Sequence, residues 1–432
     1  MSVKELLLTR YFTLRNLFVG GNVVLVLLLA AAVVKDQRRE WKEVQKEFYA
    51  REFKRLKEEK KNTPDAAHVD KHLALLRGQG IKLRQLMVPA LDRYDRCITC
   101  HLGYDTGIAP TQTTVYDDPP HKARPSAIHA SHPADKFGCT VCHEGQGLAT
   151  TARAAHGPVK HWEEPMRKGA VLEASCAKCH SNLWDAAAMP FTDNWRKGEA
   201  LFQKIGCIGC HQIHGQGGPI SVDLAEETAD KPLSRIDFSF TGLPHEDRTL
   251  ENWIRLHFVK DPWTLVPGDP EGLHNDEPVP PSGMPFFSLS AEEADALTTY
   301  VLSLGGDRIP AEFLAPASPR PAPVFRNAIE RGRAVYVKYG CGGCHAPDGT
   351  GGIRNFNYVN DTEPNLVKVV GTYTRHELQE KIEKGVSPVD KKDPKGPTPS
   401  LYMPGWKEKI KGQEMDDLLT YLFSIAEKDE DW

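Results

Sequence analysis

All ten cysteines of the chain lie in copies of one short pattern, Cys-x-x-Cys-His. The five copies are Cys97/Cys100/His101, Cys139/Cys142/His143, Cys176/Cys179/His180, Cys207/Cys210/His211 and Cys341/Cys344/His345. The composition predicts only about 0.01 copies by chance, so the repetition is not accidental. In this motif the two thiols attach a haem covalently, and the adjacent histidine becomes the proximal ligand of its iron. The sequence therefore predicts five haem c groups.

Zinc is the main alternative, because zinc sites use the same residue types. A closed zinc site takes four protein ligands, usually from two such pairs. Here the number of cysteine pairs is odd, and each pair ends in its own histidine, which argues against zinc. A thioredoxin-like redox dithiol fits the pattern less well than zinc does. The net charge of −4 gives no indication of nucleic acid binding. A hydrophobic fraction of 40% fits small domains whose cores consist largely of haem.

The N-terminal segment contains a long apolar run. Residues 16–34 carry no charge over 19 positions, which is enough to cross a bilayer as one helix. Basic residues flank both ends, so the positive-inside rule gives no orientation. Because c-type haem is attached outside the cytoplasmic membrane, we expect the haem domains on the periplasmic side. A cleaved signal peptide, with Ala30–Ala32 as its cleavage site, is the alternative to the single-pass anchor that we favour.

The next segment, residues 36–62, is highly charged and has neither glycine nor proline. Trp41, Val44, Phe48 and Leu56 lie at or near helical spacing and form one narrow apolar stripe. A helix with so narrow a stripe is not stable alone. We therefore expect it to dock against another subunit, the alternative being a solvated spacer.

The remaining motifs differ in style along the chain. The first three lie within a stretch that is rich in His, Gly and Pro, whereas the last two lie in segments that repeat one another, "WRKGEALFQKIGCIGCH" and "IERGRAVYVKYGCGGCH". Each repeat predicts a helix that ends in glycine before the motif, then a Met-Pro and a closing helix. The predicted domains are an anchor (1–35), a charged docking helix (36–62), a three-haem module (63–188), a first haem domain (189–309), a proline-rich linker (310–324) and a second haem domain (325–432).

The two C-terminal segments resemble class I cytochrome c domains, in which an N-terminal helix, the haem motif, a loop methionine and a C-terminal helix follow in order. The expected fold is therefore mainly α: a transmembrane helix, an irregular three-haem module and two tandem cytochrome c helical domains. In "SLYMPGW", Pro404 prevents helix continuation and leaves Met403 in a loop as the distal ligand opposite His345. Met415 has helical spacing and is expected in the core.

The preceding domain has the same arrangement. Met284 precedes Pro285 in "SGMPFF" and is the expected distal ligand opposite His211. Ser290 and Glu293 predict a capping box at the start of the closing helix. Four histidines are rival ligands. His257 is expected to pack in a helix, and the other three are expected on loop surfaces: His214, His245 and His274.

The segment around the first three motifs is similar to multihaem modules of membrane-anchored bacterial cytochromes, which accompany quinol-oxidising cytochrome b or bc-type complexes. Its methionines include Met87, which is expected in the core of a helix, and Met166. Several histidines bracket the second motif, so we expect three bis-histidine irons with no fixed pairing. The candidate distal ligands are His129, His132, His156 and His161, with His121 in reserve.

This resemblance implies an electron-transfer subunit of a respiratory chain. Methionine raises the potential of a haem relative to a second histidine, so electrons would run from the anchor towards the C-terminus. The implied partners are membrane lipid, an integral-membrane cytochrome b or other quinol-oxidising subunit as donor, and a soluble cytochrome, oxidase or reductase as acceptor. We expect no active site in the chain itself. The alternative is a multihaem reductase or peroxidase-like enzyme with one open haem site.

Overall fold

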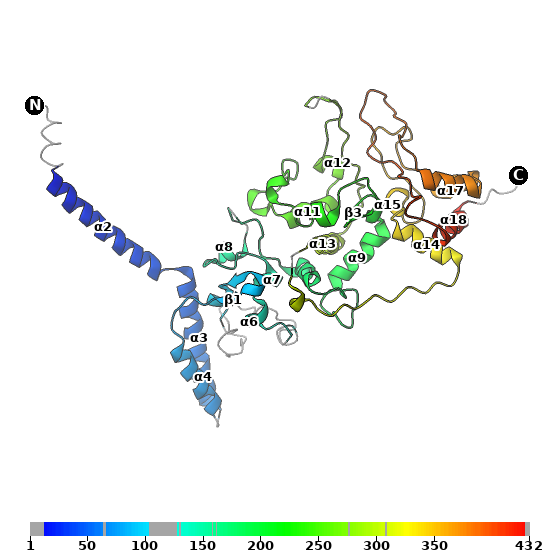
Figure 1. Cartoon of the computed structure of the whole chain (residues 1–432). Coiled ribbons are helices and arrows are strands. Elements are labelled where there is room, and N and C mark those ends of the chain that lie inside the picture. Colours follow the sequence, from blue (N-terminus) through cyan, green and yellow to red (C-terminus); the bar gives the residue numbers. More distant parts are fainter. Residues whose placement is uncertain are drawn as a thin grey trace, which may run out of the picture. The chain divides into compact units, whose positions relative to one another are not determined.

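The structure is a computed structural model that describes residues 13–63, 66–102, 128, 131–157, 159–160, 162–274, 277–306 and 309–427. It is mainly α-helical with few and short strands, which confirms the predicted fold class (Figure 1). The chain divides into two compact units, Met1–Val141 with Gln146–His156 and Cys142–Gly145 with Gly157–Trp432.

In the first unit and at its boundary the α-helices are α2 (Leu14–Gln37), α3 (Glu40–Asn62), α4 (Ala67–Gly78), α6 (Ala134–Phe137), α7 (Thr140–His143) and α8 (Ala152–His156). In the second unit they are α9 (Asp193–Ile205), α10 (Leu224–Glu227), α11 (Leu250–Val259), α12 (Pro262–Leu265), α13 (Ala291–Leu302), α14 (Ala328–Lys338), α15 (Gly342–His345), α16 (Leu366–Val369), α17 (Arg375–Lys384) and α18 (Gln413–Ile425). The strands form two antiparallel pairs, β1 (Leu86–Val88) with β2 (Arg93–Asp95) and β3 (Gln212–Ile213) with β4 (Gln216–Gly217).

The helix α2 covers the apolar run of the sequence. Its residues are exposed along almost the whole length, and the helix is long and apolar enough to cross a membrane. Length and composition fit a membrane anchor or a signal sequence equally well.

The charged helix α3 packs within the chain, and its docking against another subunit stays a prediction. Phe48 and Leu56 are buried in a cluster with residues of α4 and with Leu102, just after the first motif. The Gln45 side-chain amide, also buried, donates to the carbonyl of Thr99 inside that motif at 2.8 Å. The apolar stripe of α3 is therefore covered by the chain itself, because α4 supplies the second apolar face that a narrow stripe needs.

The segment before the first motif is a strand pair and not a helix. Leu86 pairs with Asp95 and Val88 with Arg93 across a tight turn. Met87 lies on β1 with 64% of its surface exposed, so the expectation of a helical core position is wrong. Pro89 explains the difference, since it prevents a helix from continuing through this stretch.

The last two motifs lie in two domains with the same helical plan. In one, α9 crosses α13, and in the other α14 crosses α18. The crossing point carries a glycine in each case: a Cβ on Gly198 would lie 2.8 Å from the Cβ of Tyr300, and one on Gly332 would lie 2.7 Å from the Cβ of Tyr421. The predicted capping box of Ser290 and Glu293 is present at the start of α13. These crossings build the two cores on which the haem motifs rest.

The proline-rich segment between the two domains is largely exposed, as predicted. It nevertheless contacts the rest of the second unit at two points. The Ala315 N–H donates to the carbonyl of Cys179 at 2.9 Å. Further along, the Arg320 guanidinium contacts the Glu199 carboxylate at 2.6 Å and lies over the ring of Trp184.

Candidate haem sites

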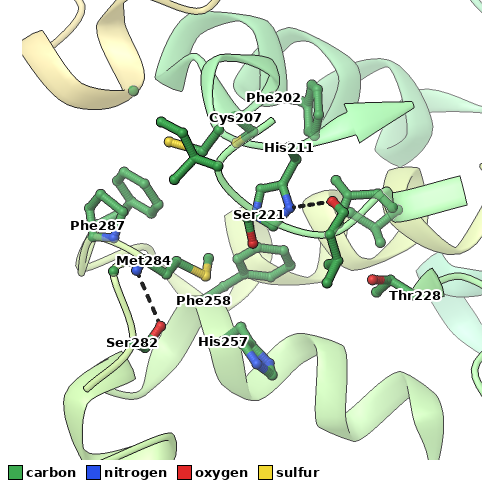
Figure 2. A pocket seen from close by; sticks show the side chains of 18 of the residues that line it. Phe202, Cys207, His211, Ser221, Thr228, His257, Phe258, Ser282, Met284 and Phe287 are labelled. Carbon is green, nitrogen blue, oxygen red and sulfur yellow. Dashed lines mark hydrogen bonds between the residues drawn. The ribbon is translucent and has the colours of Figure 1, made fainter. Parts of the chain in front are cut away.

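The motif of the first C-terminal domain lies at the wall of a cavity. Gly206 ends α9 with a φ of 87°, a left-handed conformation that favours glycine, and the chain then turns into the motif. The His211 ring and the Met284 thioether reach the same cavity from different elements (Figure 2). The cavity has a volume of about 240 Å³ and is otherwise lined mainly by apolar side chains such as Phe258.

The orientation of His211 is that of a metal ligand. Its Nδ1 lies 3.0 Å from the carbonyl oxygen of Val222, which can only accept a hydrogen bond, so Nδ1 carries the proton. The other ring nitrogen, Nε2, then keeps its lone pair for iron. Burial also lowers the pKa of His211, which keeps the imidazole neutral. A neutral imidazole, a thioether and two thiols form a donor set that fits haem c.

The second C-terminal domain repeats these contacts. Nδ1 of His345 lies 3.1 Å from the carbonyl oxygen of Pro364, and burial lowers the pKa of this imidazole as well. Met403 is half-buried against the core of the domain, in a loop whose backbone pairs with Val386. Met415 is 4% exposed on α18, in the core position that its spacing predicted. His376 is exposed on α17 and contacts no haem motif among the described contacts.

The rival histidines of the first C-terminal domain separate into two kinds. His214, His245 and His274 are exposed, as the sequence suggested. His257 lies on α11, also as predicted, but its ring lines the haem cavity (Figure 2). Its Nδ1 donates to the Trp253 carbonyl at 2.8 Å, and burial lowers its pKa. His257 is therefore a second neutral imidazole beside Met284.

In the first unit, two histidines are brought together. The rings of His101, in the first motif, and His156, at the end of α8, have centroids 5.9 Å apart and planes at 48°. Two imidazoles on opposite sides of one metal ion, with metal–nitrogen bonds of roughly 2 Å, have ring centres on the order of 6 Å apart. The pair thus has the spacing of two axial ligands of one iron.

His132, one of the predicted distal ligands, lies next to α6. Its Nδ1 lies 3.1 Å from the Ile128 carbonyl oxygen, which can only accept a hydrogen bond, and its ring packs on Phe137 with centroids 5.1 Å apart. The other candidates, His121, His129 and His161, lie outside the described residues.

The first two motifs are tied together by one buried carboxylate. Asp95, which is 1% exposed, lies two residues before the first motif. Its oxygens accept hydrogen bonds from the N–H of Cys139, from the N–H of Thr140 at 3.0 Å and from the Thr140 hydroxyl at 2.7 Å. The carboxylate therefore caps the start of the second motif.

The second and third motifs are tied by a buried ion pair. Glu144 directly follows the second motif, and its carboxylate binds the ammonium of Lys178, which lies between the two cysteines of the third. Their side chains are 9% and 8% exposed. The backbone N–H of Arg167 also donates to the His143 carbonyl at 2.6 Å.

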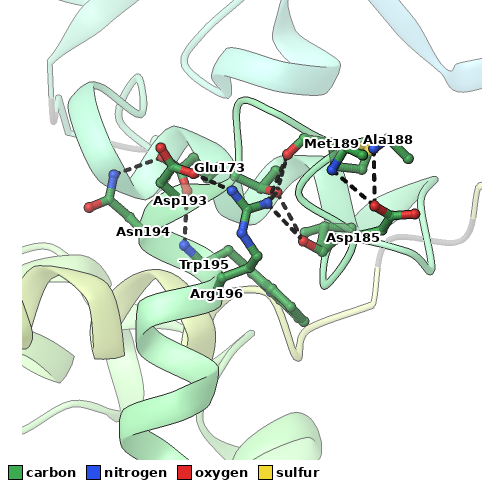
Figure 3. Close-up of polar contacts among 11 residues, drawn as sticks. Glu173, Asp185, Ala188, Met189, Asp193, Asn194, Trp195 and Arg196 are labelled. Carbon is green, nitrogen blue, oxygen red and sulfur yellow. Dashed lines mark hydrogen bonds and ion pairs between the residues drawn. The ribbon is translucent and has the colours of Figure 1, made fainter. Parts of the chain in front are cut away.

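The third motif is joined in turn to the first C-terminal domain. Glu173 lies on the 3-10 helix η3 (Gly169–Lys178), and its carboxylate accepts the Trp195 N–H at 2.8 Å and the Asn194 amide at 2.7 Å at the start of α9 (Figure 3). Burial raises the pKa of Glu173. Val171 and Ala174 of η3 belong to the same core as α9 and α13.

Three kinds of residue at these sites are not evident from the sequence patterns. Asp95 and Glu144 look like ordinary charged residues, and only the fold shows that they join motifs. The carbonyls of Val222 and Pro364, which accept hydrogen bonds from His211 and His345, belong to the backbone and cannot be predicted from a pattern of side chains. Met189, however, has the same Met-Pro setting as Met284 and Met403 and lies nine residues after His180. In the structure its carbonyl accepts Arg196 at 2.8 Å (Figure 3).

Comparisons with known proteins support the assignment of the last two motifs. No curated protein and no solved structure gave a significant match to the chain. The family model described as Cytochrome c matches two segments, residues 195–305 and 329–426. Both matches contain one motif, one Met-Pro loop and the crossing helices described above, and they imply covalently bound haem and electron transfer. Residues 195–305 and 329–426 are therefore two tandem cytochrome c domains.

Proposed function

We propose that the chain is an electron-transfer cytochrome subunit with five covalent haems, which carries electrons from a membrane quinol-oxidising complex to an acceptor on the periplasmic side. The α2 helix would anchor it in the cytoplasmic membrane. Haem c, when bound, supplies reversible one-electron chemistry. The residues of this chain attach it, complete its coordination and set the spacing between successive sites.

The direct contacts between successive motifs carry this proposal. Asp95 joins the first motif to the second, and the pair of Glu144 with Lys178 joins the second to the third. Glu173 then joins the helix of the third motif to α9, which leads into the fourth. A binding protein or sensor has no need to place every motif against the next, whereas a conductor of electrons does.

The proposed axial ligands order the sites by potential. His101 with His156 would be a bis-histidine site, and His132 would serve another iron of the first three motifs. His211 with Met284 and His345 with Met403 would be the histidine–methionine sites. Because methionine raises the potential, electrons would pass from the anchor-proximal motifs to the C-terminal domains.

The proposal is tested first on the reduced, detergent-purified full-length protein. Mass spectrometry counts the covalent haems, and a titration with carbon monoxide detects any iron with an open position. We expect five haems and no carbon monoxide binding at low concentration. One haem that binds carbon monoxide fully would move the protein to the multihaem reductases or peroxidase-like enzymes, with a substrate site beside that haem.

The methionine ligands are tested by Met284→Ala and Met403→Ala. Each change should abolish the sulfur-to-iron charge-transfer band of one oxidised haem and lower the potential of that haem alone. Met415→Leu is the matched control, since Met415 lies in the core, and it should leave the band unchanged. If Met284→Ala leaves its band intact, or if His257→Ala removes it, the ligand assignment in that domain is wrong.

A further inference from the structure

The two cytochrome c domains meet at their haem motifs. Sγ of Cys210 lies 3.9 Å from Sγ of Cys344, and these are the second cysteines of the fourth and fifth motifs. The separation is about twice the roughly 2.05 Å of a disulfide bond, so the sulfurs are in van der Waals contact. Equivalent residues of the two repeats thus face one another.

Glycines make this approach possible. A Cβ built on Gly206 would lie 2.5 Å from the backbone nitrogen of Gly343, and one built on Gly343 would lie 2.5 Å from the carbonyl oxygen of Gly206. Gly209 and Gly340 oppose each other in the same way, each Cβ running into the backbone of the other. Exchanging the two domains exchanges these two pairs, so the contact has an approximate two-fold symmetry.

Only the domain contact accounts for two of these glycines. Gly206 and Gly340 follow helices and have φ of 87° and 67°, a conformation that favours glycine for local reasons. Gly209 and Gly343 are not among the residues with positive φ, so their own backbone accepts any side chain. Their lack of a Cβ is required by the opposite motif alone.

Other contacts around the glycines hold the domains in one orientation. The Arg354 guanidinium lies 3.0 Å from both carboxylate oxygens of Asp261 and stacks on Trp263 at 4.1 Å. On the side of the methionine loops, the Ser400 hydroxyl donates to the carbonyl of Pro281 at 3.1 Å. One guanidinium nitrogen, Nη2, makes both contacts with Asp261, and charge-assisted hydrogen bonds of this kind are stronger than neutral ones.

From these contacts we infer that the two C-terminal domains are a fixed electron-exchanging pair, in which the glycine contact of Gly206, Gly209, Gly340 and Gly343 holds the thioethers of Cys210 and Cys344 together. This rests on the proposed function only in that both motifs carry haem. One electron would pass directly between the pair: one iron goes from ferrous to ferric and the other from ferric to ferrous, with no proton or further reactant. The last domain would not swing between donor and acceptor.

The test uses the full-length protein and the double variant Gly209→Val/Gly343→Val. Expected are the same haem count as the unaltered protein, loss of the magnetic coupling between two ferric haems in the electron paramagnetic resonance spectrum, and at least a tenfold slower exchange between the two C-terminal haems after flash photoreduction. The matched control is Gly306→Ala/Gly371→Ala, at glycines of the same two domains where a Cβ meets nothing closer than 3.6 Å. It should change neither readout.

A second pair of variants covers the case in which the valines block haem attachment. Arg354→Asp should weaken the coupling by opposing Asp261, and the charge swap Arg354→Asp/Asp261→Arg should restore it. If the coupling and the exchange rate persist in both the valine and the Arg354→Asp proteins, the fixed pair is refuted. If mass spectrometry finds Cys210 and Cys344 in a disulfide and without haem, the proposed function of these motifs fails instead.

Discussion

The first two haem motifs lie close together, and so do the last two, but the contacts that hold each pair differ. At the first, a single buried carboxylate, Asp95, accepts three hydrogen bonds from the beginning of the second motif. At the last, the backbones of four glycines approach so closely that a Cβ on any of them would meet the opposite motif, and the sulfurs of Cys210 and Cys344 lie in contact beside them. Two motifs are thus brought close together either by hydrogen bonds to one buried carboxylate or by glycines that leave no Cβ between the two backbones.

The two devices should fail differently. Loss of the carboxylate leaves buried donors without an acceptor, which costs stability. Loss of a glycine adds atoms to a contact between domains that are each folded around their own core. The first change should therefore act on folding, and the second on the distance between two sites.

The largest effect is expected for Asp95→Ala. It would leave the N–H groups of Cys139 and Thr140 and the Thr140 hydroxyl without their acceptor, at a cost of about 4 kcal/mol in the free energy of unfolding. Denaturant unfolding, followed by the haem absorption of the first unit, measures it. Asp135→Ala removes the same charge from an exposed position and should change the free energy by less than about 0.5 kcal/mol. Equal values for the two variants would show that Asp95 does not hold the joint.

A smaller effect is expected when a glycine inside a domain is compared with one between domains. Gly198→Ala should destabilise the first C-terminal domain by about 3 kcal/mol, because a Cβ there meets the Ala296 carbonyl and Tyr300 across the helix crossing. Gly209→Ala should cost less, since two folded domains can move apart. Thermal unfolding compares both with Gly306→Ala, whose Cβ would meet nothing within 4 Å. A larger loss for Gly209→Ala than for Gly198→Ala would contradict the distinction.

Much of this architecture follows from local sequence. Spacing predicts the crossing helices, Gly206 and Gly340 predict where two of them end, and the proline after Met403 separates a loop methionine from the core residue Met415. These features depend on neighbours within a few residues, which is the range that a pattern encodes.

The features named next could not be predicted from the sequence, because each is a contact between segments that are distant along the chain. The stripe of α3 predicts that something covers it, but not that α4 does. His101 and His156 are 55 positions apart, and nothing in their surroundings predicts that their rings meet. Gly209 and Gly343 look like ordinary motif residues until the opposite domain is in place.

The smallest effect concerns the Glu363 carboxyl. Its side chain accepts a hydrogen bond from the Asn355 amide at 2.8 Å. Burial raises the pKa of Glu363 from 4.5 to about 6. One buried acceptor with one donor thus contrasts with Asp95 and its three.

The sign of the resulting pH dependence follows from the raised pKa. The folded state favours protonated Glu363, so this stabilisation is fully present below about pH 4.5 and is lost as the pH rises through about 6. The free energy of unfolding should fall by at most about 2 kcal/mol across this window, with solvent screening making the loss smaller. In Glu363→Gln the fall should be smaller by this amount, because other buried carboxyls with a raised pKa, such as Glu173, still contribute, while Glu312→Gln, at an exposed position, should keep the full fall. Unfolding midpoints measured between pH 4 and 7 decide the matter, and an unchanged fall in Glu363→Gln would assign it to another group.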